Sequence, residues 1–194
     1  MKSSKIRKLG RRSLISLGLL AVFTAPSFTH AEDRAEPLFG TPIHDGNGCP
    51  QGSPALITIQ GEQIMVEAPF GVSNTQQSFC GVSIPVSLPS GYRLEFSNAY
   101  LEGDSQILVG AKAEAHLETF MAGEEGEKLS SVAQSGSAPF RVVGSATQHS
   151  RCVGGGILRL QASGQTRVNG TFGAFGSLIV RKFGVSTRAV PCKL

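Results

Sequence analysis

The stretch QILVGAKAEAHLETFM, residues 106–121, decides the fold. Apolar or small side chains occupy every second position, and mostly polar side chains lie between them. The first set is Ile107, Val109, Ala111, Ala113, Ala115, Leu117, Thr119 and Met121, and the second includes Gln106, Lys112, Glu114, His116 and Glu118. A repeat of two places alternate side chains on opposite faces of a strand, whereas a helix would scatter the apolar ones around its circumference. The stretch therefore predicts one long β-strand with one buried face.

Shorter alternating runs on both sides of this stretch predict further strands. They span residues 55–60, 63–68, 82–88, 92–101, 140–144, 157–162, 167–172 and 177–183. Turn-forming sequences separate several of them, at residues 60–62, 89–91, 102–104 and 163–165. Many short strands, 24 glycines and no long amphipathic helical pattern predict an all-β antiparallel sandwich, with a β-barrel as the alternative.

The N-terminal residues predict export. Six of the first twelve residues are Lys or Arg and none is acidic, and an apolar segment over 14–25 follows. This order is typical of a signal peptide, and the segment is shorter than the ~18 apolar residues that a membrane span needs. Small residues at Thr29 and Ala31 predict cleavage after Ala31. The pair Arg11-Arg12 also resembles the twin-arginine export motif, so both export routes stay open.

The rest of the chain has the length of one domain. Residues 32–46 contain two prolines and mixed charges, which predict a flexible lead-in, and residues 47–194 are predicted to form a single β-rich domain. No later segment is apolar over the length of a membrane span, so no transmembrane segment is expected after cleavage. The mature protein is expected to be secreted or periplasmic.

The basic character of the whole chain comes from the predicted signal peptide. Without it, 12 of the 18 Lys and Arg residues remain against 14 Asp and Glu, which removes the general argument for nucleic-acid binding. All 14 acids precede residue 128, and nine bases follow residue 127. The bases considered for a binding face are Arg141, Arg151, Arg159, Arg167, Arg181 and Lys182. Either they gather and attract anionic glycans or lipid head groups, or strands from the two halves neutralise each other.

Four cysteines predict two disulfides. Cys49, Cys80, Cys152 and Cys192 all lie in the mature chain, and an even count suits an oxidising compartment. Three pairings are possible. Cys49–Cys80 with Cys152–Cys192 is favoured because each bridge closes a loop of roughly 30 to 40 residues between segments expected to be neighbours. The spacing lacks the closely placed pairs of a zinc site, and no cofactor is predicted.

A resemblance to a family of secreted proteins adds to these predictions. The segment Gly46-Asn47-Gly48-Cys49-Pro50-Gln51-Gly52-Ser53 resembles the opening motif of the domain of unknown function 4360 family, and Phe79-Cys80-Gly81-Val82 resembles its second cysteine and following strand. The resemblance covers most of residues 46–161 and implies export, a β-fold and a disulfide between the first two cysteines. The family pattern has a third cysteine before the equivalent of Cys152, whereas this chain has Val132-Ala133-Gln134 there and offers Cys192 instead. The resemblance implies no active site.

The sharpest candidate for chemistry is Glu114, His116 and Glu118, with Lys112 beside them. On a strand these side chains line one face, with alternate residues ~7 Å apart. An imidazole between two carboxylates is the start of a metal site or an acid–base pair, and the alternative is a solvated polar face. Residues 45–48 and 154–156 partly resemble a calcium loop and a phosphate cradle, but both are interpreted as turns beside a cysteine.

These observations favour an exported non-enzymatic β-domain that acts by surface recognition or as an envelope or matrix component. One alternative is a carbohydrate-binding module, although no Trp and only two Tyr leave few side chains for stacking. Another is a hydrolase or metal-dependent enzyme that uses Glu114, His116 and Glu118. No catalytic residue is assigned, because the local motifs of serine hydrolases, zinc proteases and nucleotide-binding proteins are absent.

Overall fold

A computed structural model describes residues 35–169 and 173–192, and the regular structure of these residues is entirely β-strand. Sheet A contains β1 (Leu38–Phe39), β2 (Ile43–Asp45), β5 (Gln77–Ser87), β7 (Ala111–Met121), β8 (Glu127–Ala133) and β11 (Gly155–Val168). Sheet B contains β3 (Leu56–Gln60), β4 (Gln63–Ser73), β6 (Tyr92–Ile107), β9 (Gly136–Val143), β10 (Gln148–His149) and β12 (Gly176–Pro191). The described residues include no helix that could span a membrane.

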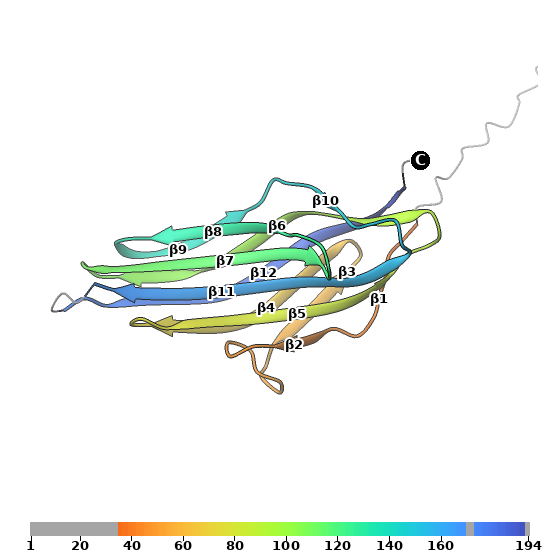
Figure 1. The fold of residues 1–194 in the computed structure, drawn as a ribbon. Helices are drawn as coiled ribbons and strands as arrows, with labels where there is room; N and C mark the ends of the chain where they lie inside the picture. Colours follow the sequence, from red (N-terminus) through yellow and green to blue (C-terminus); the bar gives the residue numbers. More distant parts are fainter. Residues whose placement is uncertain (1–34, 170–172, 193–194) are drawn as a thin grey trace, which may run out of the picture. The chain divides into compact units, whose positions relative to one another are not determined.

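The two antiparallel sheets pack face to face (Figure 1). The strand order is β1-β5-β11-β7-β8 in sheet A, where β2 also pairs with β5. In sheet B it is β10-β6-β12-β4-β3, and β9 also pairs with β6. The predicted sandwich is confirmed, and the barrel alternative is not adopted.

The core lies between the sheets, and β7 shows how the sequence builds it. Its alternating positions from Ala111 to Met121 are buried, and the positions between them are partly exposed. Bulky side chains of sheet B fill the space opposite, among them Leu101, Val180 and Phe183, each with 0% of its surface exposed. Burying a side chain of this size contributes about 1.5–3 kcal/mol, so this inner face is the main source of stability.

The stretch 106–121 forms two strands, not the single strand that its alternation predicts. β6 ends at Ile107 and β7 begins at Ala111, whose amide donates to the Leu108 carbonyl at 3.1 Å. Gly110 adopts a φ of +84°, which a residue with a side chain rarely tolerates. Val109 is 83% exposed at this turn, although its parity predicts burial. Apolar or small residues continue to occupy every second position through residues 107–111, so the repeat of two gives no sign of the turn.

Two predicted turns lie inside long strands. β6 continues through residues 102–104, and β11 continues through residues 163–165. A Cβ on Gly103 would lie 2.1 Å from the carbonyl oxygen of Ile179, and one on Gly164 would lie 2.8 Å from Cδ2 of Leu178. These glycines therefore permit close approach inside the sandwich instead of reversing the chain. A different error concerns β8, a strand that the sequence analysis does not predict.

Part of the expected flexible lead-in over 32–46 pairs with sheet A. Leu38 registers with Ser87 in β1, and Ile43 registers with Ser83 in β2. Both short strands cover the edge of β5, whose backbone groups would otherwise lack partners. Residues 38–39 and 43–45 therefore belong to the sandwich. The predicted signal peptide over 1–31 and its cleavage site lie outside the described residues.

Both disulfides follow the favoured pairing, Cys49–Cys80 and Cys152–Cys192. The first is buried, and the turn before it is shaped for close contact with β5. A Cβ on Gly46 would lie 2.3 Å from the carbonyl oxygen of Phe79, and Asn47 Oδ1 accepts a bond from the Phe79 amide at 2.8 Å. The side-chain oxygen of Asn47, within the segment 45–48 that resembles a calcium loop, therefore holds this turn on the sheet.

Candidate recognition site

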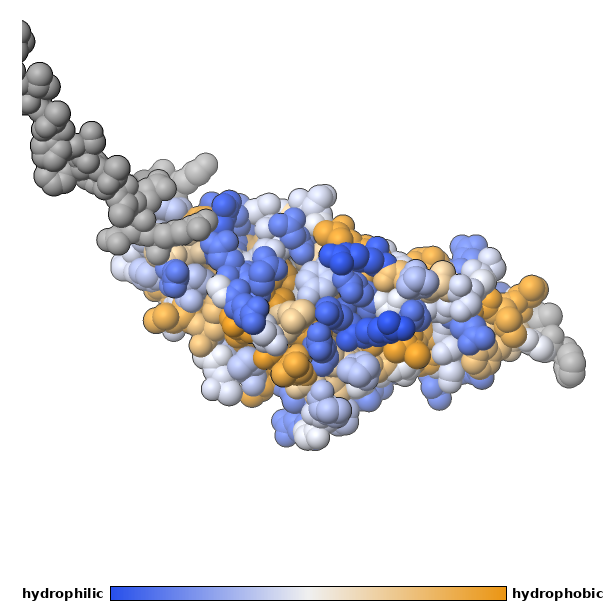
Figure 2. All heavy atoms as spheres, turned by 180° about the vertical axis from the view of Figure 1, so that it is seen from behind, coloured by the Kyte–Doolittle hydropathy of each residue, from blue (hydrophilic) through white to orange (hydrophobic). Residues whose placement is uncertain are grey.

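The outer face of sheet B brings distant residues into register as four rows that cross the strands. The charged row is Glu67, Lys182, Glu102 and Arg141; the apolar row is Met65, Gly184, Tyr100 and Val143; the polar row is Gln63, Ser186 and Ser97; and the ion-pair row is Arg188, Glu95 and His149. Figure 2 shows the molecule from behind, on this side, where hydrophilic residues gather across the middle of the face. Polar, charged and apolar side chains thus follow one another along the strands.

A hollow of about 380 Å³ lies over the polar and ion-pair rows, and we call it the polar hollow. It is lined by Glu62, Gln63, Glu95, Ser97, Asn98, Thr147, Ser186, Thr187 and Arg188. The carboxylates accept hydrogen bonds, the guanidinium donates them, and the hydroxyls and amides do both. Small-molecule pockets are usually lined by apolar side chains, so this lining suits a ligand rich in hydroxyl groups.

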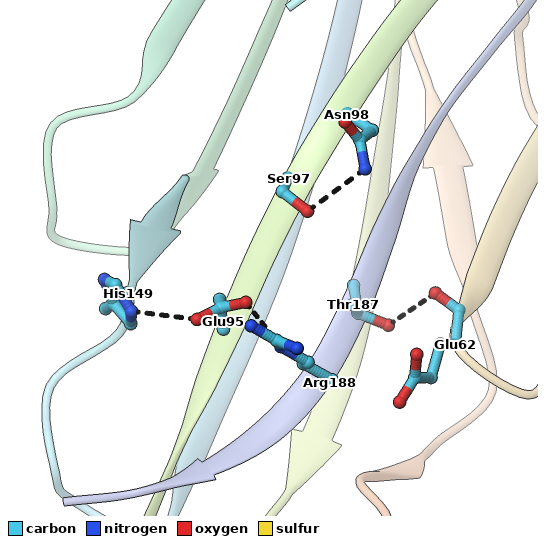
Figure 3. Close-up of polar contacts among 7 residues, drawn as sticks. All are labelled: Glu62, Glu95, Ser97, Asn98, His149, Thr187 and Arg188. Atoms are coloured by element: carbon cyan, nitrogen blue, oxygen red, sulfur yellow. Dashed lines mark hydrogen bonds and ion pairs between the residues drawn. The ribbon is translucent and has the colours of Figure 1, made fainter. Parts of the chain in front are cut away.

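Glu95 forms one wall of the polar hollow and lies between two partners (Figure 3). Arg188 Nε donates to Glu95 Oε1 at 2.5 Å, and His149 Nε2 lies 3.1 Å from Glu95 Oε2. The hydrogen bond from Arg188 is the largest cause that lowers the pKa of Glu95, and burial opposes it. The carboxylate is therefore ionised at neutral pH and holds no proton for general acid catalysis.

A β-bulge in β6 shapes the lining beyond Glu95. The register of β12 and β6 passes from Gly184–Tyr100 to Ser186–Ser97, so β6 has one residue more than β12 in this interval. The extra length is absorbed at Asn98, whose φ is +50°, a value that Asn tolerates better than most residues. A bulge redirects a side chain away from the regular alternation. Here it places the exposed Asn98 beside Ser97 in the lining of the hollow.

Tyr100 lies across β12 because Gly184 leaves room for its ring. A Cβ on Gly184 would lie 2.8 Å from Tyr100 Cε1 and 2.9 Å from its hydroxyl oxygen. The guanidinium carbon of Arg141 lies 5.6 Å from the ring centroid, within cation–π range. Burial raises the pKa of Tyr100, so its phenol is neutral and can both donate and accept. The ring thus has fixed neighbours in the row next to the polar hollow.

The basic residues of the C-terminal half are largely neutralised by acids from the N-terminal half. The pairs are Arg141–Glu102, Arg151–Glu124, Arg181–Asp104 and Lys182–Glu67. Arg159 and Arg167 lie on β11 in sheet A, away from the bases of β9 and β12 in sheet B. Of the two alternatives for the uneven charge, the structure shows neutralisation for these four bases, between paired strands for Arg141, Arg181 and Lys182 and between two loops for Arg151. The six bases do not gather on one sheet.

The predicted trio of Glu114, His116 and Glu118 lies on the outer side of β7, in sheet A. His116 Nδ1 is 2.9 Å from Ser130 Oγ, and His116 Nε2 is 3.7 Å from Glu114 Oε2. Glu118 registers with Lys128 of β8. Burial is the largest cause that lowers the pKa of His116, so its imidazole is neutral at neutral pH. The three side chains share a face, as the alternation predicts.

Glu114 is occupied by neighbours that leave little room for a metal or a substrate. Lys112 forms an ion pair with it, and Gln165 Nε2 donates to its Oε2 at 2.5 Å. The bond from Lys112, followed by that from Gln165, lowers the pKa of Glu114 to about 2. Among residues 35–169 and 173–192, no three His, Cys, Asp or Glu side chains are placed to hold a metal ion. The arrangement matches the polar-face alternative.

Sequence patterns did not point to the polar hollow. Its lining comes from segments far apart, as the 125-residue separation of Glu62 and its partner Thr187 shows. His149 lies outside every alternating run in the sequence, and β10 pairs it with Glu95. The alternating polar residues of β6 and β12 indicate only that one face is polar. Strand pairing is what brings them together.

Comparisons with known proteins give no family for this chain. No family description matches it, and no curated protein matches it. Among solved structures, TmCBM61 in complex with beta-1,4-galactotriose is 16% identical over 79% of this chain and 90% of its own, with a TM-score of 0.25. A family 11 carbohydrate-binding module from Clostridium thermocellum, solved with a mixed-linked tetrasaccharide, is 11% identical over 81% and 91%, with a TM-score of 0.23. PfGH50B is 11% identical over 78% of this chain and 23% of its own, with a TM-score of 0.24.

Proposed function

We propose that this chain is an exported, non-enzymatic recognition module that binds a glycan in the polar hollow of sheet B. The observation that carries the proposal is the lining of that hollow, in which every side chain is polar or charged. A glycan presents many hydroxyl groups, each of which donates and accepts. Amides, hydroxyls, carboxylates and a guanidinium, most of them on strands of sheet B, satisfy both roles.

Binding is favoured over hydrolysis by the state of the acids. Glycoside hydrolysis uses a pair of carboxyl groups, one of which keeps a raised pKa so that it can protonate the leaving oxygen. Glu62 and Glu95 both line the polar hollow, but the pKa of Glu95 is lowered by Arg188. The trio on β7 also lacks the raised pKa that a general acid needs at Glu114, because the pKa of Glu114 is about 2.

Export is supported by the two disulfides and by the basic and apolar N-terminal sequence. Disulfides persist in oxidising compartments and are rare in the cytosol. Within the described residues no cysteine is free. A recognition module with these bridges suits the periplasm, the cell surface or the extracellular medium.

The test is a titration of the isotopically labelled mature domain with neutral and acidic oligosaccharides, followed by NMR. Amide resonances of β6 and β12 around the polar hollow should shift. Gln63→Ala removes a hydrogen-bonding amide of the hollow and should weaken binding about three- to tenfold. Gln161→Ala is the matched control, because Gln161 is exposed on β11 of sheet A. Absence of any shift, or equal effects of the two substitutions, would overturn the proposal.

A further inference from the structure

We infer that the glycan is an uncharged oligosaccharide that lies along β6 and β12, with one sugar ring on Tyr100 and the next in the polar hollow. The inference rests on the proposed function and adds the chemical class of the ligand, its direction and the residue that selects it. Its basis is the juxtaposition of an aromatic ring with a hydroxyl-binding hollow and the charges around both.

The apolar and polar rows are neighbours along both central strands. Tyr100 and Gly184 oppose each other in one row, and Ser97 and Ser186 oppose each other in the next. Outward positions on a strand are ~7 Å apart, and the bulge at Asn98 adds to this spacing on β6. This is the scale of one sugar unit, so consecutive rings of a chain parallel to the strands would meet the aromatic ring and then the hollow.

The apolar row supplies what the polar hollow lacks. A pyranose ring has a C–H face as well as hydroxyl groups, and a ligand site needs an apolar surface for the first and polar groups for the second. Tyr100 is half-buried, and Met65 and Val143 flank the Tyr100–Gly184 pair in the same row. Gly184 backs the ring and the Arg141 guanidinium lies over it, so a bound sugar would take the place of Arg141 on the ring, while Arg141 keeps its ion pair with Glu102.

The charges around these rows include no excess of bases, which disfavours an anionic ligand. The acids are Glu62, Glu67, Glu95 and Glu102, and the bases are Arg141, Lys182 and Arg188. Lys182 Nζ lies 3.1 Å from Glu67, and Arg141 lies 2.6 Å from Glu102. An anionic glycan would find no excess of positive charge here and would approach four carboxylates, so its binding is disfavoured.

Calorimetry with the tightest-binding oligosaccharide from a panel of neutral glucose-, galactose-, xylose- and mannose-based chains tests the inference. Tyr100→Leu keeps an apolar side chain without the ring and should lower affinity about tenfold. Tyr100→Phe keeps the ring and should change affinity less than about threefold. Affinity for the wild type should be unchanged from about 0.05 to about 0.5 M salt, and uronic acid or sulfated chains should bind more weakly.

The outcomes separate the two proposals. If a neutral oligosaccharide binds, Gln63→Ala weakens it and Tyr100→Leu does not, the polar hollow is the site but the inferred ring contact is wrong. Loss of affinity with salt, or preference for acidic chains, would refute the uncharged ligand while leaving a glycan in the hollow. Absence of all oligosaccharide binding overturns both. Thermal unfolding of each variant, with the disulfides intact, confirms that the comparison is made between folded proteins.

Discussion

The stability of the fold should depend on Leu117 and not on Val109, although both belong to the same apolar set of residues 106–121. Leu117 has 0% of its surface exposed at the centre of β7, where it registers with Leu129 on one side and Ala162 on the other. Val109 is 83% exposed in the turn before that strand. Truncating each to alanine compares a core position with a surface position of identical sequence parity.

The expected cost of Leu117→Ala is about 3–4 kcal/mol. Removal of a buried leucine side chain loses its transfer free energy and leaves a cavity that strands held in register fill poorly. For a domain of this length each kcal/mol lowers the midpoint temperature by about 2–4 °C, so the variant should melt roughly 10 °C below the parent. Val109→Ala removes little buried surface and should stay within about 0.5 kcal/mol.

Urea denaturation of the oxidised mature domain, followed by far-ultraviolet circular dichroism, measures both costs. The slopes of the transitions should be equal, so that the midpoints report stability alone. A Val109→Ala cost similar to that of Leu117→Ala would refute the turn at residues 108–110 and restore a single strand through the whole stretch.

Four further outcomes are expected. Because the folded-state pKa of Glu114 is about 2 against an ordinary 4.5, its contribution is complete above about pH 4.5 and lost as pH falls towards 2; thermal melts of Glu114→Gln should lose less stability over that window than the parent. Replacing Cys49 and Cys80 by serine should cost about 3–4 kcal/mol in urea. The folded mature domain should flow through an anionic column at about 0.05 M salt, because acids pair with the bases of the C-terminal half; retention on the column would contradict this pairing. Intact-mass analysis of exported protein should find Glu32 as the first residue.

The candidate site was beyond reach of the sequence because no short segment contains it. Glu95 and Arg188 form their ion pair across β6 and β12, and His149 joins them from a two-residue strand. Alternation assigns each of these residues to a face but does not name its partner. The trio on β7 was visible because it lies within one strand, where a repeat of two is sufficient to align side chains.

The sequence by itself determined most of the strands, because side chains that alternate with a repeat of two point to opposite faces of a strand wherever they occur in a chain. It correctly assigned the buried face of β7, the sandwich class and, through loop length, the pairing of the four cysteines. Tertiary structure decided the function of the glycines, since Gly103 and Gly164 allow close contacts that only packed neighbours create. It also decided the polar hollow, because hydrogen bonding between β6 and β12 sets the register that places Tyr100 beside the polar row.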